Sequence, residues 1–356
     1  MIYYGRILAN HTIMTKRNDQ QMALELLKYA SKPLSISALS QHLSDEIPLR
    51  TLRRWLAGWI AKKQVLRSGS ARATRYQFAH QISTPKTDNA LLLAFLRHLD
   101  ADLKANLLTQ IRDLWTHTST ALEGNTLSLG DTHFILEQGL TVSGKPIREH
   151  QEVIGHAKAI DLLYQCLHQP LTEKILFDLH KAVQSEPVFD IYKPNGDWKA
   201  EPNGTYAIDP RGNQVFIEYA MPVFVPALMA ELINEINEVA PENTNLRNAP
   251  YHYAKIHMGI AHIHPFWDGN GRIARLLANI PLLKAGLPPL VISQQQRRTY
   301  IQVLANYQLG VGQLTKRSGV WPELAMLKQF SNFCAPCYDT TSELVKKAHE
   351  IQDKRS

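Results

Sequence analysis

Cysteine and long apolar runs are both scarce in this sequence. The 356 residues contain three cysteines, Cys166, Cys334 and Cys337, which are too few for a disulfide framework and are typical of a reducing compartment. Cys334 and Cys337 make a single CxxC pair, and a zinc site would need a second ligand pair with suitable spacing. We therefore interpret them as ordinary thiols near a helix end rather than as a redox or zinc centre.

The longest apolar run, Ile273 to Leu287, is interrupted by Arg275 and Lys284, so it cannot be interpreted as a membrane span. Residues 1–18 lack the continuous hydrophobic segment of a signal peptide. We therefore expect a soluble, cytoplasmic protein with no membrane partner.

Acidic residues are scarce at the N-terminus. Residues 1–80 contain 13 Lys and Arg but four Asp and Glu, a balance of +9, whereas the whole chain has a net charge of +7. The remaining residues therefore sum to −2. This asymmetry favours a separate N-terminal module with a polyanionic partner, and it does not require the rest of the chain to bind nucleic acid.

The N-terminal module is predicted to contain three helices and one β-hairpin. Apolar spacing predicts helices over 19–30, 35–43 and 48–64, and strands over 65–67 and 73–78. This order resembles a winged helix-turn-helix domain, which implies a recognition helix in the major groove of DNA and a wing on its phosphates. The arginines that would make these contacts are Arg50, Arg53, Arg54, Arg67, Arg72 and Arg75. Binding of a protein, or docking on the rest of the chain, stays open as the alternative.

The chain from residue 89 onward is predicted to be helical almost throughout. The exception is Pro194 to Glu218, which is rich in Gly, Pro and Asn and should contain strands over 205–208 and 214–217. The expected fold class is mainly α: an all-helical core with a small β-hairpin, preceded by a small winged-helix domain. The expected bounds are 1–80 for the first domain, 81–88 for a linker, 89–330 for the core and 331–356 for a C-terminal helical tail.

The densest chemistry lies in HPFWDGNGRIAR, from His264 to Arg275. A helix is expected over 250–263, which the proline after His264 would end, and another over 273–284. The turn between them, Asp268 to Gly271, contains two glycines. Because it lies at the N-terminus of the second helix, its backbone N–H groups can form an anion nest.

The side chains around this nest suit a phosphate ligand. Arg272 and Arg275 lie three residues apart on the second helix and flank the same site. Asp268 is an oxygen ligand for Mg²⁺, which accompanies nucleotide phosphates. His264 can take a proton from an attacking hydroxyl near neutral pH, and Phe266 would point inward to fix the loop. Together these residues predict phosphoryl or nucleotidyl transfer.

The same segment matches every fixed position of the Fic signature, HxFx(D/E)GNGRxxR, and the chain resembles that family over roughly residues 89–330. The resemblance implies a Mg²⁺- and ATP-dependent nucleotidyltransferase. In it, His264 deprotonates a Ser, Thr or Tyr hydroxyl of a target protein, and the hydroxyl attacks the α-phosphorus of ATP. The resemblance assigns the metal to Asp268, phosphate oxygens to Gly269, Asn270 and Gly271, the β-phosphate to Arg272 and the γ-phosphate to Arg275.

A second motif of the same family, (S/T)xxxE(G/N), is matched by Ser119 to Gly124. Ser119 and Glu123 are four residues apart and share a helix face. The resemblance implies an inhibitory helix near 112–124. Its Glu123 would pair with Arg275, occupy the space of the γ-phosphate and hold ATP in an unreactive pose.

The resemblance also assigns positions with weaker motifs. The region 197–219 would be a flap that aligns the target chain by strand addition. Its tip would be Gly204, Thr205, Tyr206 and Ala207. Tyr300 and Tyr307 are candidates for the adenine pocket, with a position in the core as the alternative for either.

Other functions remain open. Glu123 could orient a water and remove AMP from a modified protein, or the enzyme could do both. The chain could instead be a DNA-binding regulator whose Fic domain senses ATP, as the +9 segment suggests. The family also includes enzymes with other nucleotide or phosphocholine donors, and its members often form homodimers. His252, His257 and His262 are wrongly spaced for a metal site on one helix face, so they are expected to be neutral core or surface side chains.

Overall fold

The computed structural model describes residues 93–184, 193–209 and 211–355, and parts of the segment 20–78. The chain divides into two compact units, residues 1–84 and 85–356, and each has its own hydrophobic core. The expected linker and Arg72 lie outside the described residues.

The described elements of the N-terminal unit follow the predicted order, and the helix expected over 19–30 lies only partly within the described residues. The unit contains α2 (Ile36–Gln41), α3 (Leu49–Ala61) and an antiparallel hairpin of β1 (Val65–Ser68) and β2 (Arg75–Phe78). Leu34 adds a bridge to Tyr76, through hydrogen bonds in both directions. The apolar face of α3 buries Leu52, Leu56 and Trp59, whereas the arginines of the predicted DNA-binding set that are described, Arg50, Arg53, Arg54, Arg67 and Arg75, are all exposed. The assignment as a winged helix stays a prediction.

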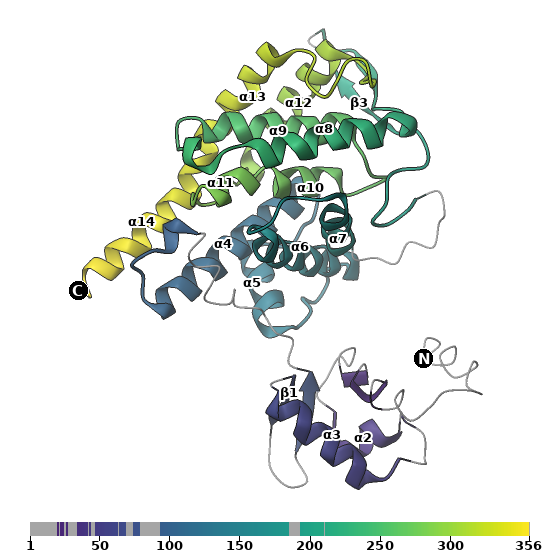
Figure 1. Cartoon of the computed structure of the whole chain (residues 1–356), viewed down its shortest axis with the longest axis vertical. Helices are drawn as coiled ribbons and strands as arrows, with labels where there is room; N and C mark the ends of the chain where they lie inside the picture. Colours follow the sequence, from purple (N-terminus) through teal and green to yellow (C-terminus); the bar gives the residue numbers. More distant parts are fainter. Residues whose placement is uncertain are drawn as a thin grey trace. The chain divides into compact units, whose positions relative to one another are not determined.

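The C-terminal unit is mainly α, as predicted (Figure 1). Its α-helices are α4 (Ala101–Leu122), α5 (Leu129–Gln138), α6 (Ile147–Cys166), α7 (Glu173–Val183), α8 (Val225–Glu238), α9 (Ala249–Ile263), α10 (Asn270–Leu277), α11 (Ile280–Lys284), α12 (Arg297–Val311), α13 (Leu327–Cys334) and α14 (Asp339–Asp353). Among the described residues its strands are β3 (Gly204–Ile208) and β4 (Gln214–Glu218), which form one antiparallel hairpin. None of the described helices combines the length and the apolar character that crossing a bilayer requires.

Helix α9 lies at the centre of this unit. It packs against α8, α10, α11 and α13 (Figure 1), and twelve of its fifteen residues are buried, as expected for a helix that is apolar on every side. Gly259 permits a close approach, because a Cβ there would crowd Leu232 of α8 and the side chains of Val320 and Trp321. The C-terminal end of this rigid helix carries His264.

The helix after the motif differs from the prediction. It begins at Asn270 rather than at 273, and it breaks between α10 and α11. The buried Asn279 lies at the break, where its side-chain amide donates to the carbonyls of Arg275 and Leu290 and its Oδ1 accepts from the N–H of Leu290. Pro281, which has no N–H to continue the helix ladder, lies two residues after Asn279 in the first turn of α11.

The expected tail at 331–356 is not a separate part, and this boundary was wrong. It would cut α13, whose Phe330 and Cys334 are fully buried in the main core. Helix α14 packs against α4, and Thr341 at its start donates a hydrogen bond to the carbonyl of Pro289. Cys334 and Cys337 are both buried and are free thiols.

Candidate active site

The loop that carries the motif begins with a reversal of the chain at His264. Its N–H still donates to the carbonyl of Ile260, but its backbone is left-handed, with φ of 53°. Few residues other than glycine adopt this conformation, and such strain is concentrated at functional sites. Gly269, with φ of 80°, then starts α10. The loop therefore turns His264 and the N-terminus of α10 toward the same region.

The imidazole of His264 is held by stacking rather than by strong hydrogen bonds. Its ring lies parallel to that of Tyr219, with centroids 3.8 Å apart, and its Nδ1 is 3.4 Å from the carbonyl oxygen of Ala261. Burial, assisted by the positive charge of Lys199, lowers the pKa of His264 to about 3. The ring is therefore neutral near pH 7, which leaves one ring nitrogen with a lone pair.

Asn270 and Phe266 lock the loop from inside. The side chain of Asn270 accepts from the N–H of Phe266 at 2.9 Å and donates to its carbonyl at 2.8 Å, and the ring of Phe266 is fully buried, as predicted. The amide of Asn270 is thus used within the protein. What remains for an anion are the N–H groups of the first turn of α10, which have no partners within the helix.

Asp268 suits a metal ion that enters the site already bound to phosphate oxygens. Its Oδ1 accepts from the N–H of Gly269 at 2.7 Å, and its Oδ2 lies 3.5 Å from Nη2 of Arg272. Its side chain is about half exposed, at 48%. The described residues contain no cluster of three or more His, Cys, Asp or Glu that could hold a metal ion. A single open carboxylate suits Mg²⁺ whose other ligands are water and phosphate oxygens.

Arg275 binds the end of helix α4. Its Nη2 lies 2.6 Å from Oε1 of Glu123 and 2.8 Å from the carbonyl of Ser119, and its Nε donates to Oγ of Ser119 at 3.0 Å. The predicted pair of Glu123 and Arg275 is therefore present. It uses one carboxylate oxygen rather than a bidentate contact, because Ser119 and the hydroxyl of Tyr300 take other donors of the guanidinium. The helix is also longer than expected, since it starts at Ala101 and has Glu123 as its C-cap.

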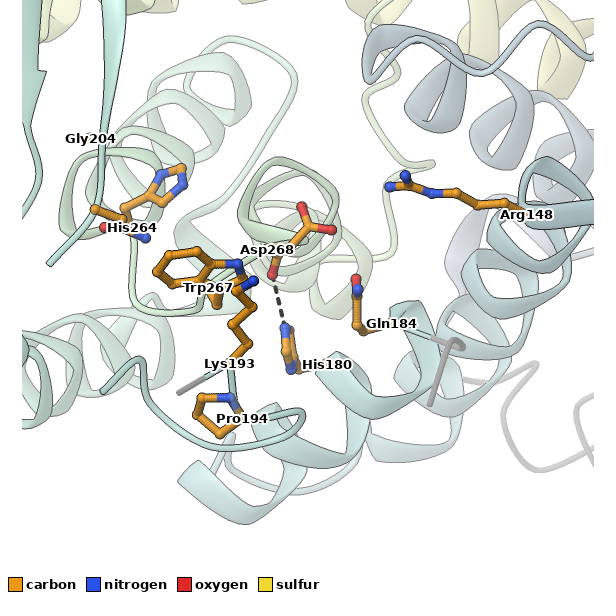
Figure 2. A pocket seen from close by; sticks show the side chains of 10 residues that line it. Arg148, His180, Gln184, Lys193, Pro194, Gly204, His264, Trp267 and Asp268 are labelled. Atoms are coloured by element: carbon orange, nitrogen blue, oxygen red, sulfur yellow. Dashed lines mark hydrogen bonds between the residues drawn. The ribbon is translucent and has the colours of Figure 1, made fainter. Parts of the chain in front are cut away.

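Two cavities meet at His264, the one residue that lines both. The larger, of about 660 Å³, is lined by His264, Asp268, Trp267, Gln184 and two cations, Arg148 and Lys193 (Figure 2). The smaller, of about 260 Å³, is more apolar and is lined by Leu122, Ile217, Ile301 and Leu304 together with Glu123, Gly271, Arg297 and Tyr300. The site can thus accept two separate reactants with His264 between them.

Comparison with known proteins identifies the domain that contains this site. Residues 170–282 match the model of the Fic/DOC family. The chain carries a Fic domain. It is 34% identical over 204 residues to protein adenylyltransferase fic-1 of Caenorhabditis elegans, which covers 55% of this chain and 37% of that protein. It is 32% identical over 231 residues to protein adenylyltransferase Fic of Drosophila willistoni, with 64% and 40% covered. The chain thus spans about two fifths of the length of these relatives.

Solved structures show the same fold. A Fic domain containing signaling protein from Bacteroides thetaiotaomicron has a TM-score of 0.62 at 27% identity, over 74% of this chain and 96% of that one. Fic-1 of C. elegans has a TM-score of 0.55 at 23% identity, over 95% and 83%. Both matches support the fold described above, a mainly helical core with one hairpin among the described residues.

The predicted tip of the flap does not lie at the turn of the hairpin in the Fic domain. Gly204 to Ala207 lie within strand β3, and the turn is at Asp209 to Asn213. Asp209 organises this turn, because its Oδ1 accepts from the N–H groups of Arg211 and Asn213. Gly204 lines the larger cavity and Thr205 to Ala207 line the smaller one. The predicted residues therefore border the site along a strand rather than at a tip.

The two tyrosines predicted for the adenine pocket have different positions. Tyr300 lines the smaller cavity, but its hydroxyl is held between Nη1 of Arg275 at 3.1 Å and Nε2 of His257 at 3.0 Å. Tyr307 is a core aromatic, 2% exposed, with its ring edge-on to His262, so its assignment to the pocket was wrong. His257 and His262 are fully buried, and burial lowers their pKa values, as expected for neutral core histidines.

Three residues of the site were missed by the sequence argument: His180, Lys199 and Tyr219. Lys199 is buried, its ammonium donates to Oδ1 of Asn203 at 2.6 Å, and burial lowers its pKa to about 7. Burial lowers the pKa of His180 to about 4, and Tyr219 stacks on His264. All three lie outside the motif, between 45 and 84 residues before His264, so no local pattern in the sequence could have placed them there.

Proposed function

We propose that this chain is a protein adenylyltransferase that moves AMP from ATP to a Ser, Thr or Tyr hydroxyl of a target protein and is restrained by Glu123. The observation that carries the proposal is the contact of Glu123 with Arg275 beside the nest. In the adjacent motif loop, the neutral His264 lies between the two cavities. The adenylyltransferase names of the relatives support the same reaction.

The chemistry follows from the positions of the side chains. His264 takes the proton of the target hydroxyl, whose oxygen attacks the α-phosphorus of ATP, and the bond from that phosphorus to the bridging oxygen of pyrophosphate breaks. The N–H groups at the start of α10 stabilise charge on the phosphate oxygens, and Arg272 and Arg275 bind the β- and γ-phosphates. Asp268 would hold Mg²⁺, which neutralises phosphate charge when bound. We place the nucleoside in the smaller, apolar cavity and the target side chain in the larger one.

Restraint follows from competition for one guanidinium. The carboxylate of Glu123 lies so close to Gly271 that a Cβ there would collide with it, and it already occupies Arg275. A γ-phosphate directed at Arg275 would have to displace this carboxylate, which carries the same sign of charge. ATP therefore binds in the inhibited enzyme without the alignment that transfer needs.

Label transfer from α-labelled ATP with Mg²⁺ tests the reaction, with and without cell lysate. Hydrogen bonds to charged groups contribute about 1.5–3 kcal/mol, so Glu123→Gly should raise transfer by about 10- to 100-fold. Adding His264→Ala should abolish it. Glu238→Gly makes the same replacement at the end of α8 and should leave transfer at the wild-type level. No transfer by Glu123→Gly would refute AMP transfer from ATP.

Removal of AMP is the second candidate, because Glu123 lines the smaller cavity together with His264. There its carboxylate could orient a water toward the phosphorus of a modified side chain. Target protein labelled by Glu123→Gly in the first experiment supplies the substrate. Release of its label by wild type but not by Glu123→Gly would assign this reaction, and no release by either would exclude it.

DNA binding is the candidate from another class, and the exposed arginines of α3 motivate it. A gel shift with the full chain should show binding that weakens steeply with salt, because phosphate contacts release counterions. Arg53→Ala with Arg54→Ala should weaken it, whereas Arg247→Ala, an exposed arginine in the Fic unit, should not. Salt-independent or absent binding would leave the N-terminal unit as a protein-binding module, with homodimer formation as one form of that role.

A further inference from the structure

His180 connects three segments that are far apart in the sequence. It lies near the end of α7 and is 1% exposed. Its Nδ1 accepts from the N–H of Gly196 at 2.9 Å, and its Nε2 lies 3.0 Å from the carbonyl oxygen of Asp268. Figure 2 shows this second contact as the dashed line to Asp268. Helix α7, the segment at Gly196 and the motif loop therefore meet at one imidazole.

The two partners define the state of this ring. A carbonyl oxygen can only accept, so Nε2 must carry the hydrogen, and an N–H can only donate, so Nδ1 must be the acceptor. Both contacts are satisfied together only by the neutral tautomer with hydrogen on Nε2. The ring orientation is therefore determined by the backbone on both sides.

The face of the same ring supports the loop beside Asp268. His180 stacks on Phe266, with centroids 3.8 Å apart and an angle of 10° between the planes. It also lies against Gly269, where an added Cβ would be 3.6 Å from its Nε2. His180 thus contacts Phe266, Asp268 and Gly269, the residues that lead from the base to the nest.

We propose that His180 is a positioning residue that fixes the backbone of Asp268, so that its carboxylate faces the larger cavity and can receive the metal of a Mg²⁺–nucleotide complex. The proposal rests on the proposed function, because it assigns a role within the same site. The carboxylate itself is tied only to its neighbours Gly269 and Arg272 among the described contacts. The direction in which it points therefore depends on the peptide unit that His180 holds.

The test measures nucleotide binding rather than activity. In the Glu123→Gly background, binding of an ATP analogue with a methylene group between the α- and β-phosphorus atoms is followed by calorimetry, with and without Mg²⁺. Replacing the partner of a metal ligand typically weakens metal affinity by about 10- to 100-fold. His180→Phe keeps the stacking, so it should bind the metal-free analogue like its parent but shift the Mg²⁺ midpoint upward by about tenfold or more.

Two further replacements separate positioning from general support of the fold. The amide of His180→Gln can reach the position of Nε2 and donate to Asp268, so it should recover much of the Mg²⁺ response. The shorter His180→Asn can replace only Nδ1, so it should behave like His180→Phe. His262→Phe, which replaces a fully buried histidine of α9 that packs on Tyr307, should retain the parent midpoint.

A parent-like Mg²⁺ midpoint in His180→Phe, or in His180→Asn if the phenylalanine variant does not fold, would overturn the proposal. An equal shift in His262→Phe would overturn it as well, because any buried histidine would then have the same effect. Label transfer by the Glu123→Gly parent is scored separately. Failure of that transfer removes the proposed reaction but leaves the binding result and its assignment to His180 standing.

Discussion

At the scale of single residues, the site depends on side chains with two partners each. Tyr300 is the clearest case, because its hydroxyl accepts from Arg275 and donates to the buried His257. Tyr300→Phe leaves both groups without this partner in the protein interior, so we expect a loss of about 1–3 kcal/mol in the free energy of unfolding. Urea denaturation measures this loss, and weaker binding of ATP should accompany it because Arg275 is less well held.

Tyr307→Phe is the matched control for this residue. Its hydroxyl is equally buried, but it has no hydrogen-bond partner among the described residues, so its removal should cost almost nothing. Equal losses for the two replacements would show that the bridge between Arg275 and His257 does not stabilise the fold.

At the scale of elements, the turn that follows helix α4 adjoins Glu123 and its contact with Arg275. Asn125 is 5% exposed, and its amide donates to the carbonyl of Glu149 and to Oε2 of Glu152 on α6. Its Oδ1 accepts from the N–H of Leu127. This side chain therefore joins the turn after Glu123 to α6, without touching the motif loop in any described contact.

Asn125→Ala should loosen that turn and release Glu123 part of the time. We expect AMP transfer between that of wild type and that of Glu123→Gly, a rise of about threefold to tenfold if one or two net hydrogen bonds are lost. Asn248→Ala removes a comparable turn residue at the start of α9 and should not raise transfer. A variant of Asn125 that is less stable but no more active would show that α6 does not hold Glu123 in place.

At the scale of the whole molecule, buried histidines should make the C-terminal unit sensitive to acid. His156, His180, His257 and His262 are 0–1% exposed, and burial lowers the pKa of each, to about 4 for His180 and His262. The unfolded chain binds protons at these groups below about pH 6.5, whereas the folded chain does not. Their stabilising effect is therefore complete above pH 6.5 and is lost as the pH falls toward 4.

Each such histidine lowers the free energy of unfolding by up to ~1.4 kcal/mol per pH unit in this window. Asp161 opposes one of them, because burial raises its pKa to about 6 and the folded state then holds the extra proton. The urea midpoint should fall clearly between pH 7.5 and 5.5, and His262→Phe should make that fall smaller. A midpoint that stays constant or rises on acidification would show that these histidines are not held neutral.

Much of this protein could be predicted from local sequence. The order of the described helices and hairpins, the split of charge between the two units and the Fic signature in HPFWDGNGRIAR all follow from patterns that a few neighbouring residues carry. Such patterns work because helix spacing, turn residues and a nest of backbone N–H groups are themselves local. The contact between Glu123 and Arg275 was predicted by family resemblance, and the structure contains it.

The tertiary structure alone decided which distant residues complete the site. His180 reaches the motif loop because α7 packs against α10. The N–H of Lys199 donates to the carbonyl of Pro265, and Tyr219 stacks on His264. No short pattern encodes these contacts. The same reason explains the errors: Tyr307 and the C-terminal helices were assigned by their position in the chain, but their apolar faces are buried in the common core. Burial also lowers the pKa of His264 and keeps its ring neutral, because removing a charge from water is costly. The degree of burial is set by the fold and cannot be predicted from neighbouring residues.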